Sequence, residues 1–363
     1  MGAGDPRPLI WLLSAYRSAS HAAWTDWLQR RMDHVRWEVL ELPGRHFAWR
    51  IRGNPLSWID RLPAGLPDRI LATSMVDLAT LKGLHPRLAS IPTIYYFHEN
   101  QFAYPVGPRQ HQSPPGMPRG FLEPAMVQLY GGLAADRLVF NSAFNRDSFF
   151  QGIDELLSRL PDQVPTGIVD RLQTRSQVLP VPIRPIAPAR EKDARLIVWN
   201  HRWEYDKCPD AFAEAMLALA GNGVDFRLAL LGPRHEKNPP SALVRLTQAL
   251  SERIVADGRV DSSRYRQILG RAGILVSTAI HEFQGLAVLE GASAGARPLV
   301  PDRMCYPEQY PPEYLYPAGN IDELVRRMRD WLESGLPPPA DCSPWTEASL
   351  SGPWRDLLAG EGA

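Results

Sequence analysis

A buried strand that runs through a short polar turn into a helix is the feature that most constrains the fold of this chain. The apolar run Ile274–Ile280 follows Gly273 and predicts a fully buried parallel strand. The polar turn His281–Gly285 comes next, and helical spacing with small residues begins at Leu286. Open α/β sheets bind their ligands where such strands end. The sequence therefore predicts an α/β fold with a ligand site at this turn.

The groups around this turn match a phosphorylated sugar. The backbone amides of Gly285, Leu286 and Ala287 open the helix, and a helix N-terminus favours an anion. Two carboxylates, Glu282 and Glu290, flank the turn with seven residues between them. A nucleotide sugar would supply a diphosphate for the amides and hydroxyls for the carboxylates. Either glutamate alone would be read as a helix cap or a solvated side chain, so the prediction depends on the pair.

Length and composition limit the class of protein. A chain of 363 residues exceeds what one hydrophobic core usually contains, so we expect two domains. The three cysteines, Cys208, Cys305 and Cys342, lack metal-ligand spacing and cannot all pair, which argues against a zinc site or a disulfide framework. The apolar run Leu9–Leu13 is too short for a signal peptide, and no run reaches transmembrane length. We expect a cytoplasmic protein that binds neither a metal nor a membrane.

The first half of the chain holds the candidates for acceptor binding. Residues 1–190 carry 21 Lys and Arg against 16 Asp and Glu, whereas residues 191–363 carry 19 against 24, which favours an anionic acceptor in the first half. The block 43–58 interleaves arginines with aromatics, a composition suited to RNA phosphates and bases. A basic surface loop with its aromatics tucked inward is the alternative. The RNA candidates in this block are Arg45, Trp49, Arg50 and Arg52.

Two strand ends in the first half offer further polar groups. The predicted strand Pro8–Tyr16 leads into a turn without glycine, where Ser20 and His21 could bind a ligand or Ser20 could simply cap the next helix. The predicted strand Pro92–Phe97 runs into four polar residues at a sheet edge, and its histidine could be functional or structural. These four residues are His98, Glu99, Asn100 and Gln101. The segment Tyr104–Gly120 is typical of a substrate lid or binding loop.

Several of these motifs resemble those of known enzymes. The spacing of Glu282 and Glu290 resembles the E-x7-E motif of family 4 glycosyltransferases of the GT-B class. Arg202 and Lys207, five positions apart after the strand Leu196–Asn200, resemble that family's diphosphate-binding pair. Longer stretches in the same order resemble the tRNA-queuosine α-mannosyltransferase family. They are LLSAYRSASHAAW, PGRHFAWRIRGNP, FHENQFAYPV, FNSAFNRDSFF, VWNHRWEYDKCPDAF, STAIHEFQGLAVLEG and PDRMCYPE.

The resemblance implies a GT-B fold with two Rossmann-like, doubly wound domains and a cleft between them. We expect an acceptor-side domain over residues 1–185 and a nucleotide-sugar domain over 186–345. Residues 346–363 would form a C-terminal tail of the kind that often packs back on the first domain. The glycine-free turn Arg17–His21 departs from the relatives, which leaves open whether this turn contacts the donor.

The resemblance also implies the reaction. Mannose would pass from GDP-mannose to the cyclopentene-diol of queuosine in tRNA with retention of configuration, and the donor substrate would be the only small molecule needed. By resemblance, Glu282 contacts the transferred sugar, Glu290 contacts the ribose, and His98 touches the sugar from the first domain. Cations at Arg202 and Lys207 would offset the charge of the departing diphosphate. No protein partner is implied.

Two other functions remain open from the sequence. The first is a family 4 enzyme that acts on a lipid or polysaccharide acceptor. The second is a non-catalytic RNA-binding protein on a GT-B scaffold, although Arg202, Lys207, Glu282 and Glu290 are all present. The hexose, the nucleotide, the tRNA, the acceptor-binding segment and the oligomeric state are not determined by the sequence.

Overall fold

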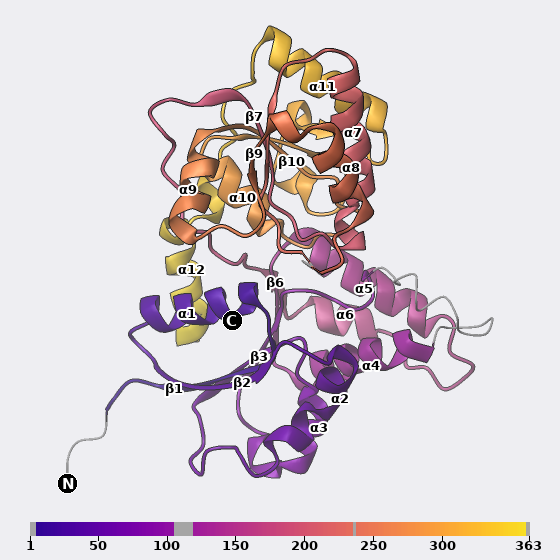
Figure 1. Ribbon diagram of the computed structural model, residues 1–363. Helices are drawn as coiled ribbons and strands as arrows, with labels where there is room; N and C mark the ends of the chain where they lie inside the picture. The colour runs from indigo at the N-terminus through magenta and orange to yellow at the C-terminus, as the bar shows by residue number, and fades with distance from the viewer. Residues whose placement is uncertain (1–4, 105–118, 235–236, 361–363) are drawn as a thin grey trace. The chain divides into compact units, whose positions relative to one another are not determined.

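The computed structural model describes residues 5–104, 119–234 and 237–360 and divides into two compact units (Figure 1). Unit 1 comprises Met1–Val181 and Ser351–Ala363, and unit 2 comprises Pro182–Leu350. The chain thus leaves unit 1 once and returns to it at the C-terminus. Among the described residues, no helix combines the length and the apolar character needed to cross a membrane.

Unit 1 is built on a six-stranded sheet with the order β2-β1-β3-β4-β5-β6, and every pairing between its described strands is parallel. The strands are β1 (Leu9–Arg17), β2 (Arg36–Pro43), β3 (Arg69–Thr73), β4 (Thr93–Phe97), β5 (Arg137–Phe140) and β6 (Ser176–Val178). Strand β4 is buried along its whole length, as expected for a central strand covered on both faces.

The helices of unit 1 connect and cover these parallel strands. They are α1 (Ala19–Arg31), α2 (Phe47–Trp58), α3 (Leu78–Leu84), α4 (Arg119–Ala134), α5 (Ala143–Leu157) and α6 (Ile168–Gln173), with a short 3-10 helix at Pro86–Leu88. Alternate residues of β1 serve the two faces of the sheet: Trp11 and Leu13 join the main core cluster, whereas Ile10 and Leu12 are buried outside that cluster. The sheet therefore has one helix layer on each face.

Unit 2 repeats this design with the strand order β12-β11-β10-β7-β8-β9, again parallel throughout the described pairings. Its strands are β7 (Asp193–Trp199), β8 (Arg227–Leu230), β9 (Ile254–Asp257), β10 (Ala272–Val276), β11 (Arg297–Pro301) and β12 (Leu315–Tyr316). Its helices are α7 (Pro209–Gly221), α8 (Ser241–Ala249), α9 (Ser262–Arg271), α10 (Leu286–Ser293) and α11 (Ile321–Ser334). Short 3-10 helices lie at Tyr205–Lys207, Ser251–Arg253, Tyr306–Glu308, Pro312–Tyr314 and Ser343–Trp345.

The last helix, α12 (Glu347–Ala359), carries the chain from unit 2 back to unit 1. Trp354 is fully buried there, packs against Trp24, Trp27 and Tyr96, and donates its indole N–H to the Pro180 carbonyl at 3.0 Å. Arg69 adds hydrogen bonds to the last carbonyls of the helix. The final residues are therefore part of the core of unit 1.

The structure corrects several sequence-based expectations. The block 43–58 is not a loop: Phe47–Trp58 forms α2, which tolerates Pro55 in its interior. Ser18, not Ser20, caps α1, because the helix begins at Ala19 and the Ser18 hydroxyl accepts from the His21 amide.

The other differences concern strands. The run after Gly273 remains a strand only to Val276, since the remaining residues form the loop that leads to the turn. The short strands β6, β9 and β12 were not expected, because their few residues carry little periodic signal. Most of the expected lid, residues 105–118, lies outside the described residues.

Candidate active site

The turn after β10 has a backbone conformation suited to glycine. Gly285 adopts φ 67° as the residue before α10, and a Cβ there would approach the Tyr306 ring to 3.0 Å. Leu286 and Ala287 then form the first turn of α10, where backbone N–H groups lack helical partners. The Gly285 amide itself hydrogen-bonds the Glu282 carboxylate. Of the three expected anion-binding amides, two therefore belong to the open helix end and one supports Glu282.

Lys207 and Glu282 form the centre of the site in unit 2. The Lys207 ammonium lies 3.0 Å from Glu282 Oε2, 3.2 Å from Asp206 Oδ2 and 2.8 Å from the His281 carbonyl oxygen. Lys207 is buried, and its 3-10 helix Tyr205–Lys207 follows the loop after β7, while Glu282 follows β10. Because β7 and β10 are parallel neighbours, their carboxyl ends bring two residues 75 positions apart into direct contact.

These contacts hold both groups in their charged forms. Burial alone would raise the pKa of Glu282, but the Lys207 ammonium and the hydrogen bonds from Lys207 and Gly285 outweigh it and lower that pKa to about 2. Burial alone would lower the pKa of Lys207, but the Glu282 and Asp206 carboxylates raise it. The site therefore contains a buried ion cluster at neutral pH, not a neutral acid–amine pair.

Arg202 extends this cluster towards the surface. Its guanidinium is 3.4 Å from the Glu204 carboxylate and 3.9 Å from that of Asp206, and its side chain is about half exposed. Asp206 thus links the two cations expected to bind the diphosphate. His201 lies beside this cluster, and burial lowers its pKa to about 3. Within the described part of the chain, His201 Nε2 and Asp206 Oδ1 are buried without a hydrogen-bond partner.

Glu290 lies in α10 and belongs to a second polar network, separate from the ion cluster around Lys207. Its Oε2 accepts the Tyr265 hydroxyl at 2.9 Å, and that hydroxyl accepts from the Asn200 amide nitrogen at 3.0 Å. Burial raises the pKa of Glu290 despite the Tyr265 hydrogen bond. Asn200 directly follows β7, Tyr265 lies in α9 and Glu290 lies in α10, so side chains from three parts of unit 2 meet here.

In unit 1, His98 and His21 stack with ring centroids 4.1 Å apart. Trp24 and Tyr96 contact His98 edge-on, with centroids 4.6 and 4.7 Å away. Burial lowers the pKa of His21 to about 4 and, together with the neighbouring His21, lowers the pKa of His98 well below its usual 6.5. His21 Nδ1 lies 2.7 Å from the Tyr16 carbonyl oxygen, which places the ring proton on Nδ1. Both imidazoles are therefore neutral at pH 7.

The polar run after β4 is mostly committed to the fold of unit 1. Asn100 is fully buried and donates to the Asn145 carbonyl and side-chain oxygens at 2.9 Å. The Gln101 backbone amide donates to Gln128, and the Glu99 carbonyl accepts the Ser74 hydroxyl. These contacts give Asn100 in particular a positioning role for the loop.

The four RNA candidates before and within α2 are exposed or only partly buried, whereas Trp58 at the end of the helix is buried. Trp49 is 49% exposed, and its ring lies over Gly53, where a Cβ would come within 2.6 Å of it. Arg45 is exposed and Arg50 is partly buried, whereas Arg52 forms an ion pair with Asp77. Ser20 is exposed and lies 3.0 Å from the Ser18 hydroxyl. Arg45 and Trp49 are thus the members of this set most available to RNA.

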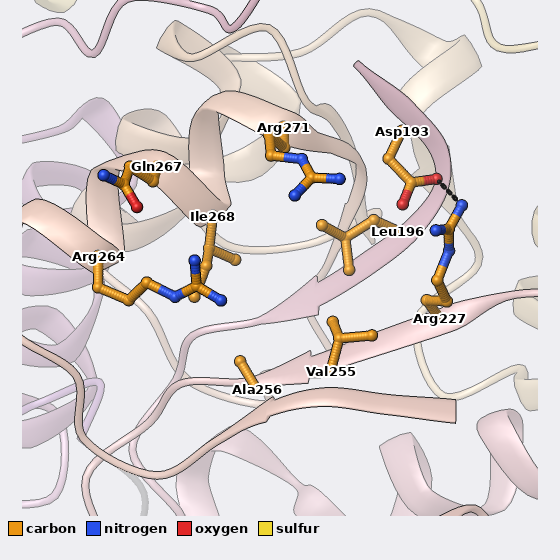
Figure 2. A pocket seen from close by; sticks show the side chains of 9 residues that line it. All are labelled: Asp193, Leu196, Arg227, Val255, Ala256, Arg264, Gln267, Ile268 and Arg271. Atoms are coloured by element: carbon orange, nitrogen blue, oxygen red, sulfur yellow. Dashed lines mark hydrogen bonds and ion pairs between the residues drawn. The ribbon is translucent and has the colours of Figure 1, made fainter. Parts of the chain in front are cut away.

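A small pocket in unit 2 is distinct from these groups. Figure 2 shows arginines of α9 and β8 around an apolar floor, with Arg227 paired to Asp193 at 2.8 Å. The pocket involves the start of β7 and of β8, whereas Lys207 and Glu282 follow strand ends. The pocket therefore lies towards the N-terminal ends of these strands, whereas the candidate site lies at the C-terminal ends.

Comparison with known proteins identifies the family. The family model for the N-terminal part of tRNA-queuosine alpha-mannosyltransferases matches residues 9–183. A Drosophila melanogaster protein named tRNA-queuosine alpha-mannosyltransferase is 32% identical over 328 residues, which cover 86% of this chain and 85% of that protein.

The chain belongs to the tRNA-queuosine alpha-mannosyltransferase family.

Solved structures agree on the architecture. Sucrose-phosphate synthase from Thermosynechococcus elongatus is similar with a TM-score of 0.70 at 12% identity, over 98% of this chain and 100% of that one. HepE from Anabaena, in complex with UDP, is similar with a TM-score of 0.66 at 12% identity, over 98% and 100% of the two chains. The expected GT-B fold is confirmed, and membership of this family makes the protein a glycosyltransferase.

Sequence reasoning missed four side chains of the site in this family member. Asn200, His201 and Asp206 lie within the quoted VWNHRWEYDKCPDAF stretch, but only its two cations stood out chemically. Tyr265 belongs to a helix 25 residues before Glu290 and carries no motif. The one available signal was position, since residues directly after a buried strand face the ligand edge of such sheets.

Proposed function

We propose that this protein transfers mannose from GDP-mannose to a hydroxyl of the queuosine cyclopentene-diol in tRNA, with retention of configuration. The observation that carries the proposal is the 32% identity to the Drosophila melanogaster protein, which extends over both units. We assign donor binding to unit 2 and acceptor binding to unit 1.

The ion cluster of unit 2 supports a role in nucleotide-sugar binding. Lys207 contacts Glu282 in the turn that leads into α10, and Arg202 joins the same cluster through Asp206. The Leu286 and Ala287 amides at the start of α10 would add to the attraction for a diphosphate. Lys207 is already hydrogen-bonded to three protein oxygens, so its main effect on the diphosphate is electrostatic. The Arg202 guanidinium is about half exposed and can donate two hydrogen bonds at once, so it suits direct contact with phosphate oxygens.

The proposed step breaks the bond between the mannose anomeric carbon and the β-phosphate oxygen. A new bond forms between that carbon and the acceptor oxygen on the same face of the sugar. The acceptor proton passes to a β-phosphate oxygen, so GDP leaves with the bonding electron pair and the proton. Arg202 and Lys207 stabilise the charge that develops on the diphosphate, and the step as written uses no metal ion.

The other side chains would orient the sugars. Glu282 lies beside the proposed diphosphate position and could accept hydroxyls of the transferred hexose while Lys207 keeps it ionised. Neutral His98 is the candidate in unit 1 for contact with the same hexose, as a hydrogen-bond partner and not as a cation. Arg45 and Trp49 are the candidates for contact with the RNA.

The test is a transfer assay with purified protein, queuosine-containing tRNA and GDP-mannose, read by nucleoside mass spectrometry. The proposal expects queuosine to gain one hexose, with no product from UDP-glucose or from tRNA that carries guanosine in place of queuosine. Hexose transfer to another acceptor, or RNA binding without transfer from any nucleotide sugar, would refute it.

A further inference from the structure

A second group of cations lies in unit 2 at the strand ends opposite to the ion cluster. A pocket of about 90 Å³ is formed by the start of β7 and of β8, by β9 and by one face of α9. We call it the arginine pocket, after the guanidinium groups of Arg227, Arg264 and Arg271 that line it. Apolar side chains, among them Leu196 and Val255, form its floor (Figure 2).

Two of the three arginines have no acidic partner in direct contact. Arg227 pairs with Asp193 at 2.8 Å, and the same carboxylate accepts the backbone amide of Arg195. Arg264 and Arg271 are exposed and form neither an ion pair nor a side-chain hydrogen bond with any described residue. Two guanidinium groups therefore remain available at the pocket, in a half of the chain whose acids outnumber its bases.

The stability of α9 does not account for both arginines. The helix begins at Ser262, so Arg264 lies in its first turn, where the helix dipole disfavours a cation. Asp261 accepts the first amides of the helix and offsets part of the Arg264 charge electrostatically. Arg271, in the last turn, is placed favourably for the dipole. Spacings of three and four residues put Arg264, Gln267 and Arg271 on one helix face, which is the face that lines the pocket.

The volume of the pocket limits the kind of ligand. A cavity of about 150 Å³ encloses one benzene ring, so a pocket of about 90 Å³ is too small to enclose a nucleobase. Its volume equals that of about three water molecules in the liquid, which suits a compact group such as phosphate. Guanidinium groups donate paired hydrogen bonds to phosphate oxygens, and the Gln267 amide adds a further donor.

The location of the pocket excludes the diphosphate of the proposed donor. Strand β7 has seven residues and spans about 20 Å. Lys207 lies beyond its carboxyl end, whereas the arginine pocket lies at its start. A polyanion can span this distance, because each strand of a duplex carries a phosphate about every 3.4 Å and about six base pairs cover the length of β7. A phosphate in the pocket therefore fits the backbone of a bound nucleic acid.

We propose that the arginine pocket binds a backbone phosphate of the tRNA acceptor through Arg264 and Arg271. The inference rests on the proposed function for the identity of the acceptor. It adds that unit 2 takes part in acceptor binding, whereas the acceptor candidates named above all belong to unit 1. A phosphate contact carries no base information, so this site raises the affinity for tRNA without selecting the nucleoside that is modified.

The experiment measures the dissociation constant of tRNA by fluorescence anisotropy over a range of salt concentrations, with the full-length protein. In the double variant Arg264→Gln with Arg271→Gln, the Kd near physiological salt should rise by on the order of tenfold, because charge-assisted hydrogen bonds are lost. The slope of log Kd against log salt should fall by about 1, the value for one phosphate contact. A tRNA with guanosine in place of queuosine should show the same changes.

The matched control is the double variant Arg245→Gln with Arg326→Gln. These arginines are also exposed in unit 2, but they pair with Asp210 and with Glu323 and Asp330, respectively. The control removes the same net charge outside the arginine pocket and should keep the wild-type Kd and salt slope. A thermal unfolding scan of both double variants checks that each is folded.

Wild-type affinity and salt slope in the Arg264→Gln, Arg271→Gln variant would overturn the inference. So would an equal loss of affinity in the control, which would indicate an effect of net charge alone, or the absence of tRNA binding by wild type. Calorimetry with inorganic phosphate separates the two sources of phosphate. Phosphate binding that the double variant loses, together with unchanged tRNA affinity, would indicate a small-anion site and would also overturn the inference.

The transfer assay distinguishes a failure of this inference from a failure of the proposed function. If wild type adds hexose to queuosine but the pocket variant binds tRNA as wild type does, only the arginine pocket assignment fails. If tRNA binding shows the expected dependence on Arg264 and Arg271 but no hexose is transferred, the RNA contact stands and the proposed reaction is refuted.

Discussion

Replacement of Lys207 by Met should destabilise the protein in a strongly pH-dependent way. Methionine has a side chain of similar length to lysine but no charge. The substitution therefore removes the ammonium that lies 3.0 Å from the Glu282 carboxylate and 3.2 Å from the Asp206 carboxylate. Asp206 is 2% exposed and Glu282 21% exposed, so water cannot replace the ammonium fully. Loss of one partner from a buried ion pair costs about 3–5 kcal/mol in the free energy of unfolding.

The pKa of Glu282 supports the lower end of this range. A fall from 4.5 to about 2 corresponds to about 3 kcal/mol of preference for the ionised form. In wild type this stability is present above the ordinary pKa of a glutamate and is lost as the pH falls from about 4.5 towards 2. In Lys207→Met, burial becomes the largest influence and raises the pKa of Glu282, so the charged carboxylate destabilises the fold at neutral pH.

The assay is urea unfolding of both proteins at pH 7.5 and pH 5.0. The deficit of the variant should be about 3 kcal/mol at pH 7.5 and clearly smaller at pH 5.0, where protons begin to neutralise Glu282. Lys192→Met is the control: Lys192 donates to the Ala272 carbonyl at 2.8 Å and, among the described residues, forms no ion pair. A deficit below about 1 kcal/mol, or one of equal size at both pH values, would show that Lys207 does not stabilise the fold by neutralising Glu282.

Three further predictions concern other parts of the molecule. Arg202→Ala should lower hexose transfer by on the order of a hundredfold. Its unfolding free energy should change little, because the Arg202 side chain is about half exposed and its shorter ion pair, to Glu204, lies at the surface. Arg245→Ala, which removes an exposed pair with Asp210, should leave transfer unchanged. Trp354→Ala should cost about 3–5 kcal/mol in urea unfolding, since the ring is fully buried among Trp24, Trp27 and Tyr96, and a loss under 1 kcal/mol would mean that α12 contributes little to unit 1. Because burial lowers the pKa values of His21 and His98, the protein should keep its stability above pH 6.5 and lose stability as the pH falls below 6.5. The decline in Tm between pH 7 and pH 5 should therefore be flatter in His98→Gln than in wild type. An unchanged slope would contradict the burial of a neutral His98.

Local sequence patterns predicted the parts of the fold that depend on residues close together in the chain. The buried strand before the turn and the helix from Leu286 follow from apolar periods that act over about ten residues. The two-sheet architecture was expected from the chain length and from the family resemblance. The same locality explains the errors. The apolar and aromatic residues of the block 43–58 do not show whether they face a helix or a loop, and two-residue β12 forms because β11 is beside it.

The sequence by itself determined the family, the paired strand–turn–helix units and the chemical types present at the turn, because those properties are written in short contiguous stretches. Only the tertiary structure decided which of these groups act on one another. Lys207 meets Glu282 because parallel strands align their ends, Tyr265 reaches Glu290 from another helix, and Trp354 returns from the C-terminus to pack beside Trp24. These contacts join residues between 25 and 330 positions apart, and no periodicity or motif encodes a distance of that kind.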